Sequence, residues 1–160
     1  MKKNSKSLFS KISNDSQTYI IAEMSANHGG NFDTAIKIIR EAKACGADAV
    51  KLQTYRGDTI TLDSDRTDFL IPGDSPWKEH TTLYSLYEKA STPWEWHEPI
   101  MERANELGLL CFSTPFDDTA LELLEGLSVP AYKIASFENT HLPLIQKVAG
   151  PDDIESRFLQ

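Results

Sequence analysis

The chain has 160 residues, of which 40% are hydrophobic and 25% are charged, and its formal net charge at pH 7 is -8. This composition is typical of one soluble globular domain and excludes a fibrous or disordered chain. Nucleic acids and anionic membranes are bound through basic surfaces, so the acidic charge argues against either partner and favours small-molecule chemistry.

The sequence predicts a cytoplasmic protein. No apolar run approaches the roughly 18 residues of a membrane span, and the polar N-terminal extension, residues 1–17, has no signal-peptide core. Cys45 and Cys111 are the two cysteines, and each lies in an apolar stretch. We expect both to be reduced thiols in the core rather than a disulfide or a metal site.

Short apolar runs alternate with segments of helical periodicity along residues 18–150. Gly46 and Gly108 stand where two of the helices should end. In chain order, the expected strands are residues 19–22, 49–53, 109–113 and 131–136, and the expected helices are residues 35–42, 83–90, 93–107, 118–124 and 142–149.

The start of the helix expected at residues 93–107 carries a complete capping-box pattern. Thr92 takes the N-cap position, Pro93 the first helical position and Glu95 the third position after the cap. Pro99 lies farther inside. A proline in a helix interior costs about 3 kcal/mol, so we expect a kink or a late start there.

The strands are almost wholly apolar, which predicts a parallel sheet of right-handed βαβ units buried on both faces. Three strands are entered alike, at residues 46–50, 108–111 and 129–132, as in a weak repeat of one βα unit. The fold class is therefore α/β. A (β/α) barrel and a doubly wound sheet would both show this repeat, and both stay open.

Polar side chains occur in and after the predicted strands. They are Glu23, Lys51, Gln53, Ser113, Thr114, Lys133 and Ser136. The carboxyl ends of parallel strands share one rim, where α/β proteins bind ligands. A buried ammonium group is costly unless an anion faces it, so Lys51 and Lys133 need a partner. One hypothesis is a structural ion pair of either lysine with Glu23. The other is a phosphate or carboxylate ligand held by both ammonium groups and the hydroxyls.

Five motifs carry a resemblance to a known family. In order and spacing, "IAEMSANHGG", "GADAVKLQTY", "TPWEWH", "LCFSTPFD" and "AYKIASFE" resemble the N-terminal half of the sialic acid synthase family over residues 18–150. Within that family, "KIASFE", "SANHGG" and "TPWEWH" are similar to the pseudaminic acid branch. The resemblance implies a (β/α)8 TIM barrel, of which this chain would hold a part, about four βα units of parallel strands.

The resemblance also implies an enzyme activity and a substrate site. Family members condense phosphoenolpyruvate with an N-acetylated amino sugar and release phosphate and a nine-carbon 2-keto sugar acid. Thr114, Lys133 and Ser136 would hold the phosphate. Phe116 would form a wall of the pocket, although a packing role in the core fits it equally well.

Three further residues would be catalytic by the same resemblance. Lys51 would face the carboxylate of phosphoenolpyruvate, and Glu23 would orient the attacking water or stabilise the developing cation. Gln53 would contact the sugar or the water. These residue types suit the reaction, because fixed ammonium and hydroxyl groups neutralise the anion in place.

Four other side chains are expected to be structural. His28 matches the family's Asn-His-x-Gly turn and has no second histidine nearby, so we interpret it as a side chain that fixes the loop rather than as a metal ligand. Trp77, Trp94 and Trp96 are expected to pack against helices rather than to form a sugar platform.

Full-length family members are homodimers and use a divalent metal of the manganese, magnesium or cobalt type. The histidine pair that binds this metal is absent here, so we expect no metal ligand in this chain. Residues 18–150 form the barrel portion, whereas residues 151–160 depart from the family pattern and suggest a truncated or frameshifted end.

Three hypotheses of function stay open. The chain is the phosphoenolpyruvate-binding half of a synthase that needs the missing half of the barrel, or a remnant that binds anions without turnover. Without the resemblance, it is a doubly wound binding domain. A half barrel leaves apolar strand edges near residues 19–22 and 131–135, so we also expect self-association.

Overall fold

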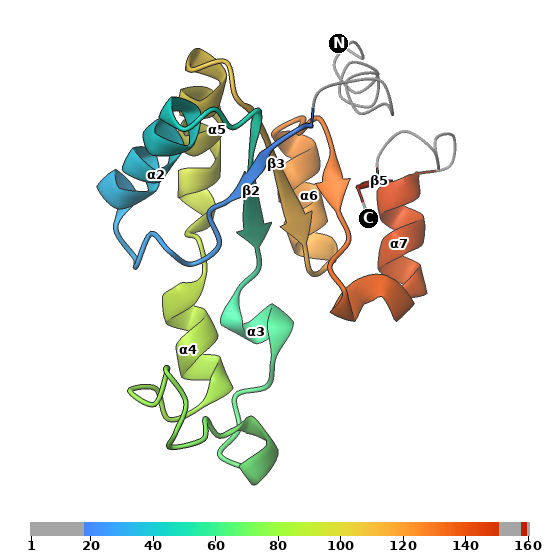
Figure 1. Ribbon diagram of the computed structural model, residues 1–160. Helices are drawn as coiled ribbons and strands as arrows, with labels where there is room; N and C mark the ends of the chain where they lie inside the picture. Colours follow the sequence, from blue (N-terminus) through green and yellow to red (C-terminus); the bar gives the residue numbers. More distant parts are fainter. Residues whose placement is uncertain (1–17, 151–157, 160) are drawn as a thin grey trace.

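The sheet is parallel throughout, and its strands follow one another in chain order (Figure 1). The computed structural model describes residues 18–150 and 158–159. The strands are β1 (Ile21–Glu23), β2 (Ala49–Thr54), β3 (Leu110–Pro115), β4 (Tyr132–Lys133) and β5 (Phe158–Leu159). The α-helices are α2 (Phe32–Ala44), α3 (Gly57–Ile60), α4 (Leu83–Ala90), α5 (His97–Glu106), α6 (Asp118–Gly126) and α7 (Leu142–Ala149), and the 3-10 helices are η1 (Thr67–Phe69), η2 (Trp94–Trp96) and η3 (Phe137–Thr140).

The strand order β1-β2-β3-β4-β5 separates the two architectures that the sequence left open. A doubly wound sheet reverses its strand order at a switch point and carries helices on both faces. Here each strand pairs with the next one in sequence, and α2, α5, α6 and α7 all contribute buried residues to a single cluster. The α/β class is confirmed, with consecutive βα units of the barrel type, and the doubly wound alternative is wrong.

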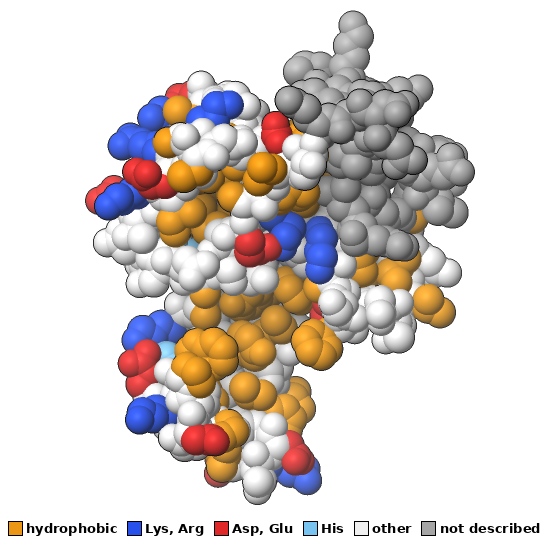
Figure 2. Space-filling model, viewed as in Figure 1, with side chains coloured by type: hydrophobic (Ala, Val, Ile, Leu, Met, Phe, Trp, Pro, Cys, Tyr) orange, Lys and Arg blue, Asp and Glu red, His pale blue; other side chains and the backbone are white. Residues whose placement is uncertain are grey.

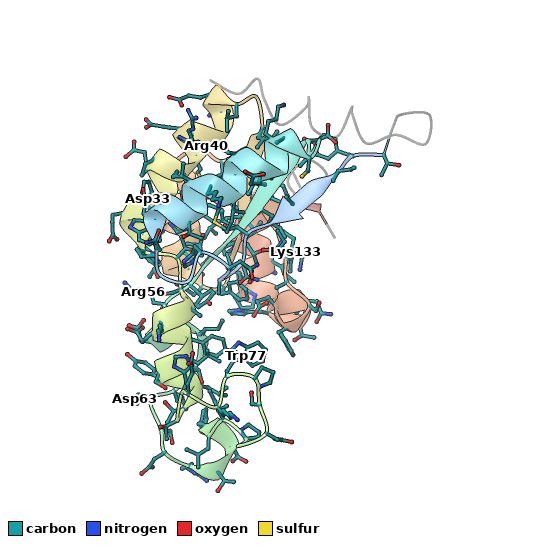
Figure 3. The ribbon with its side chains drawn as sticks, turned by 60° about the vertical axis from the view of Figure 1, so that its left-hand side comes forward. Asp33, Arg40, Arg56, Asp63, Trp77 and Lys133 are labelled. Atoms are coloured by element: carbon teal, nitrogen blue, oxygen red, sulfur yellow. The ribbon has the colours of Figure 1, made fainter. Side chains whose placement is uncertain are left out.

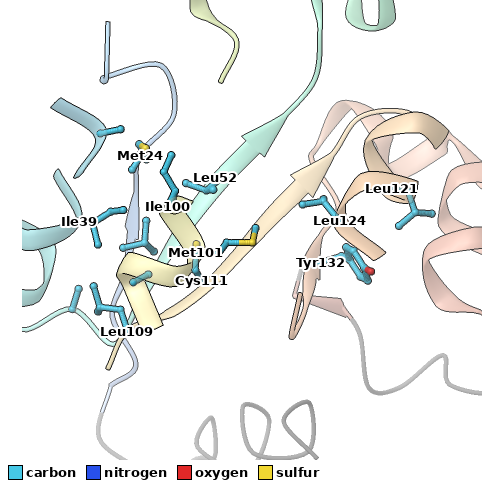
Figure 4. Packing of buried hydrophobic residues seen from close by; sticks show 14 of the residues in the cluster. Met24, Ile39, Leu52, Ile100, Met101, Leu109, Cys111, Leu121, Leu124 and Tyr132 are labelled. Carbon is cyan, nitrogen blue, oxygen red and sulfur yellow. The ribbon is translucent and has the colours of Figure 1, made fainter. Parts of the chain in front are cut away.

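The main core lies between the helices and one face of the sheet (Figure 4). Val50, Leu52 and Cys111 supply the sheet side of this cluster, and Ile39 and Ile100 are among the helical residues packed on it. All are buried, and burial raises the pKa of the Cys111 thiol to about 12. This thiol is therefore unreactive at neutral pH.

Cys45 differs from the expectation of two core thiols. It is exposed, because it follows α2 as the C-cap residue and lies past the last buried position of that helix, Ile39. The prediction of a buried thiol is confirmed for Cys111 and wrong for Cys45.

The face of the sheet opposite the helices is called the inner face here. Its apolar part is a small cluster of Ala49, Phe112 and Ala131. Side chains alternate between the two faces along a strand, and residues paired in register on neighbouring parallel strands share a face. Because Ala49 pairs with Leu110, and Lys51 with Phe112, the odd-numbered positions of β2 lie on this inner face.

Helix α5 starts later than the capping pattern at Thr92 predicts, and this confirms the late start expected from Pro99. Residues 94–96 form η2, and α5 begins at His97, which places Pro99 in the first turn and avoids a kink. The expected capping box at Thr92 is not formed. Instead Thr92 is buried and its Oγ1 lies 3.2 Å from Nε2 of His28, which ties the loop after β1 to the start of α5.

Strand β4 is shorter than predicted, and a fifth strand follows it. Residues 134–136 leave the sheet, so Ser136 occupies the N-cap position of η3 instead of a strand position. Strand β5 pairs in parallel with β4, with Tyr132 opposite Phe158 and Lys133 opposite Leu159. One of the two edges expected to be free is therefore paired over two residues. Of the expected tail and extension, residues 1–17, 151–157 and 160 lie outside the described residues.

Residues 56–91, called the lobe here, project beyond the carboxyl ends of β2 and β3 (Figure 1). Helices α3 and α4 form the neck of the lobe, where Gly57 N–H donates to Glu88 Oε1 at 2.9 Å. A Cβ atom at Gly57 would lie 2.5 Å from that oxygen, so a larger residue there would displace the Glu88 side chain from this contact. Tyr55 contacts the rings of Tyr87 and Phe116 edge to face, at 5.8 and 5.5 Å, and joins the lobe to the sheet.

A buried polar chain connects α5 with β2 and β3. Thr54 Oγ1 lies 2.8 Å from His97 Nε2 and 2.7 Å from Ser113 Oγ, and His97 Nδ1 lies 3.2 Å from the carbonyl oxygen of Pro93. The carbonyl can only accept, so Nδ1 carries the proton and Nε2 accepts from Thr54. This arrangement holds His97 neutral, in keeping with burial, which lowers its pKa.

This chain predicts a loss of stability in mild acid. The pKa of His97 is lower in the folded state than in the unfolded state, and so is that of His28, both through burial. Their contribution is therefore complete above the unfolded pKa of about 6.5 and is lost as the pH falls below it. Urea unfolding should show a free energy about 1 to 2 kcal/mol lower at pH 5.5 than at pH 7.5.

The variant His97→Gln should show a weaker pH dependence, and His141→Gln, which changes an exposed histidine, serves as the matched control. The same pH dependence in His97→Gln as in the unmodified chain would contradict this account.

The outer edge of β1 predicts self-association. On this outer edge β1 pairs with no described strand. Ile20, just before β1, and Ile21, its first residue, are exposed. An unpaired strand with apolar side chains recruits other strands, and a lysine on such an edge opposes this pairing. Sedimentation velocity should show species larger than the 17.9 kDa monomer, and Ile21→Lys should shift the distribution towards the monomer. If the unmodified chain stays monomeric at every concentration measured, the prediction is refuted.

Candidate active site

Five of the seven predicted site residues lie on the inner face. Strand register pairs Glu23 with Lys51 and Gln53 with Thr114, which places these four side chains on one face of three adjacent strands. Lys133 follows Tyr132, whose side chain belongs to the helix-side core, so Lys133 lies on the inner face as well. Figure 3 places Lys133 at the end of the sheet that faces the lobe.

Glu23 and Lys51 form an ion pair. Oε2 of the carboxylate contacts Nζ of Lys51, and the side chains are 39% and 15% exposed. This is the structural pair that the sequence offered as one hypothesis. It does not exclude the second hypothesis, because an ammonium group has three donors and one carboxylate oxygen occupies a single one. Lys51 therefore keeps donors for a further anion.

Ser25 connects two of the predicted residues and is not among the candidates from the sequence. Its backbone N–H donates to Glu23 Oε1 at 3.2 Å, and its hydroxyl donates to Gln53 Oε1 at 3.3 Å. Ser25 has a φ of 47°, in the left-handed region. A polar residue two positions after Glu23, in the turn that follows a strand, was the available signal in the sequence.

Thr114 presents a hydroxyl without a partner. The residue is 1% exposed, and its Oγ1 is buried and makes no hydrogen bond with the described part of the chain. A buried hydroxyl that stays unsatisfied costs about 1 to 3 kcal/mol, so such a group is a candidate for binding a ligand. Its neighbour Ser113 faces the other way and belongs to the His97 chain, which separates the two hydroxyls that the sequence placed together.

Lys133 is the half-buried cation of the group that makes no ion pair with a described residue. Burial raises the pKa of the Glu138 carboxyl group, and the positive charge of Lys133 opposes this rise by lowering the pKa. Figure 2 shows basic side chains beside an acidic one near the middle of the visible face, next to hydrophobic surface that continues onto the lobe.

The remaining two predicted residues lie outside this group. Ser136 is exposed at the start of η3, just after β4, and makes no capping hydrogen bond, so its part in the phosphate site stays a prediction. Phe116 is half-buried and packs edge to face against Tyr55. This contact fits the packing role that the sequence offered for Phe116. The other role, as a wall of the pocket, stays a prediction.

His28 fixes the loop after β1, as predicted. It is buried, its Nδ1 accepts from the N–H of Gly30 at 3.0 Å, and its ring meets Trp96 edge to face at 5.6 Å. Trp94 carries the guanidinium of Arg56 at 4.6 Å from its ring centroid, whereas Trp77 is 57% exposed on the lobe. Trp94 and Trp96 therefore have the packing role predicted for them, whereas the exposed Trp77 does not.

The described residues contain no group of three or more His, Cys, Asp or Glu side chains that could hold a metal ion. The divalent ion implied by the family resemblance does not fit the donors found in this part of the chain. In the same residues, no helix is long and apolar enough to cross a membrane.

Comparison with known proteins decides the family. Residues 38–153 match the NeuB family. The chain belongs to the NeuB family. It is 48% identical over 135 residues to a pseudaminic acid synthase of Campylobacter jejuni, covering 84% of this chain and 39% of that protein. It is 51% identical over 130 residues to a pseudaminic acid synthase of Helicobacter pylori, covering 81% and 38%.

Solved structures of the NeuB family share the fold. The N-acetylneuraminic acid synthetase of Leptospira borgpetersenii, in complex with citrate, superposes with a TM-score of 0.65 at 29% identity over 79% of this chain and 39% of that chain. The spore coat polysaccharide biosynthesis protein spsE of Bacillus subtilis has a TM-score of 0.64 at 34% identity, over 85% and 34%. This chain thus spans about two fifths of the length of the curated relatives that it matches.

The inner face predicts an anion site centred on Lys133. Replacing Lys133 by alanine removes the ammonium group that has no ion-pair partner among the described residues, and a charge-assisted hydrogen bond is worth about 1.5 to 3 kcal/mol. We expect the affinity for an anion, measured by calorimetry with phosphoenolpyruvate as the probe, to fall at least about tenfold. Lys37→Ala removes an exposed lysine of α2 and is the charge-matched control. Equal affinity in both variants would remove Lys133 from the site.

Proposed function

We propose that this chain forms the phosphoenolpyruvate-binding part of a sugar-acid synthase of the pseudaminic acid type. The reaction joins phosphoenolpyruvate to an N-acetylated amino sugar and gives a nine-carbon 2-keto sugar acid and phosphate. The observation that carries the proposal is the grouping of Lys51, Lys133 and Thr114 on the inner face, where the Thr114 hydroxyl has no hydrogen-bond partner in the described part of the chain. In barrels of this type, ligands bind at the carboxyl ends of the strands.

Phosphoenolpyruvate has two anionic groups, and the inner face offers two ammonium groups. Lys133 and Thr114 lie on neighbouring strands and are proposed to bind the phosphate, and Lys51 on β2 to bind the carboxylate. Ser136 is proposed to add a third phosphate contact from the segment after β4. Such fixed donors hold the substrate through the reaction and need no reorganisation when charge develops.

The bond changes define what the remaining residues have to do. The methylene carbon of phosphoenolpyruvate forms a carbon–carbon bond with the aldehyde carbon of the sugar, and the aldehyde oxygen takes up a proton to become a hydroxyl group. The phosphate-bearing carbon of phosphoenolpyruvate becomes cationic. Water adds to this carbon and releases a proton, and the resulting adduct expels phosphate, which takes the hydroxyl proton, to give the keto group. The carboxylate of Glu23 is proposed to orient that water or to stabilise the cation, and Gln53 to contact the sugar or the water.

The sugar is proposed to be a 2,4-diacetamido-2,4,6-trideoxy sugar. The support is the degree of similarity: identity is 48% and 51% with two pseudaminic acid synthases, but 29% with an N-acetylneuraminate-9-phosphate synthase of mouse. The described residues show no metal-binding group, so the steps proposed for this chain involve only its own side chains.

Anion binding without turnover is the second candidate function. The Glu23–Lys51 pair favours it, because the carboxylate already compensates one of the two ammonium groups without any ligand. The two candidates agree on the site and differ in whether phosphate is released.

Phosphate release separates the two candidates. We expect residues 1–160 alone to bind phosphoenolpyruvate without releasing phosphate, whatever sugar is added. A chimera in which the Campylobacter jejuni relative continues the chain after Gly150 should release phosphate with the 2,4-diacetamido sugar and much less with N-acetylmannosamine. Its Lys133→Ala variant should lose most of this activity, and Lys37→Ala should keep it.

Two results would contradict the proposal in different ways. Equal turnover of both sugars by the chimera would refute the pseudaminic assignment. An inactive chimera that folds and binds phosphoenolpyruvate would favour the second candidate.

A further inference from the structure

Ser25 adopts a backbone conformation that serine seldom takes. It follows β1 by two residues, with a φ of 47°. Residues other than glycine are uncommon in this left-handed region, and where they persist the surrounding structure holds them, often beside a functional site.

The conformation directs two donors of Ser25 towards the inner face. The backbone N–H reaches Glu23 Oε1 at 3.2 Å, and the hydroxyl reaches Gln53 Oε1 at 3.3 Å. Glu23 lies on β1 and Gln53 on β2, so one residue contacts side chains from two neighbouring strands. Ser25 therefore fixes the relative positions of Glu23 and Gln53.

The contact with the hydroxyl determines which end of the Gln53 amide is free. An amide side chain has an accepting oxygen and a donating nitrogen. Because Oε1 is taken by Ser25, the Nε2 hydrogens stay available. Gln53 pairs in register with Thr114, whose Oγ1 has no partner among the described residues, so two free donors stand side by side on the inner face.

We propose that Ser25 is a positioning residue whose hydroxyl turns the Gln53 amide so that its nitrogen, together with Thr114, faces an oxyanion of the substrate. The proposal rests on the proposed function in taking that oxyanion from phosphoenolpyruvate, and it gives the Gln53 nitrogen this contact in addition to the proposed contact with the sugar or the water. Ser25 itself does not touch the substrate.

The variant Ser25→Gly tests this role without straining the backbone. Glycine adopts a φ of 47° freely and keeps the N–H that donates to Glu23, so only the hydroxyl is lost. The melting temperature should stay within a few degrees of the unmodified chain. The affinity for phosphoenolpyruvate, measured by calorimetry, should fall about threefold to tenfold, the range of one net hydrogen bond.

A double-mutant cycle with Gln53→Met separates positioning from a general structural effect. Methionine approximates the length of glutamine but has no amide. If Ser25 acts through Gln53, Ser25→Gly should weaken binding in the presence of Gln53 and have no effect in the Gln53→Met background. Equal fold-changes in the two backgrounds, or no effect of Ser25→Gly in either, would overturn the proposal.

The side-chain amide signals of Gln53 in a nitrogen–proton NMR spectrum give a readout that needs no ligand. Ser25→Gly should move these signals and leave those of Gln146, on α7, in place. If the unmodified chain binds no phosphoenolpyruvate, the proposed function fails. In that case moved Gln53 signals still support the orienting contact, and unmoved signals overturn it.

Discussion

The pairing of β2 between β1 and β3 is the constraint on which the rest of the structure depends. Strand β2 has two neighbours in parallel register, and its side chains alternate between the faces of the sheet. Val50 and Leu52 enter the core beneath the helices, and Lys51 and Gln53 point the opposite way. A slip by one residue would bury a lysine among aliphatic side chains, so the same packing that stabilises the core also determines where the site lies.

The two lysines of the inner face are electrostatically different. Lys51 is compensated by Glu23, and Lys133 has no ion-pair partner among the described residues. An anion that approaches the sheet therefore meets net positive charge mainly at β4. Near β2 it meets a dipolar pair, which can rearrange to share the ammonium group. This difference suits a substrate with one strongly charged group and one weaker one.

The sequence predicts the regular part of the fold well, because burial and periodicity there point the same way. Helix α7 begins and ends at the predicted residues, and Glu23, Lys51, Gln53 and Thr114 share a face of the sheet, whereas Ser113 lies on the other face. The predictions from sequence fail for polar groups that can hydrogen-bond either to a neighbour in the chain or to a residue far away in the sequence. Thr92 has the sequence of a helix cap, yet its hydroxyl lies against His28, 64 residues away. Ser25 acts through a backbone angle that no composition rule indicates.

The neck of the lobe has a consequence for how this fold can vary. Neither core cluster contains a residue of the lobe, and the Gly57–Glu88 contact closes the lobe just beyond the sheet. Insertions, deletions and substitutions in residues 61–81 can therefore accumulate without disturbing the packing of the strands. A lineage could then remodel the surface over the strand ends by changing loop length alone, while the barrel beneath it stays under the stricter selection that a close-packed interior imposes.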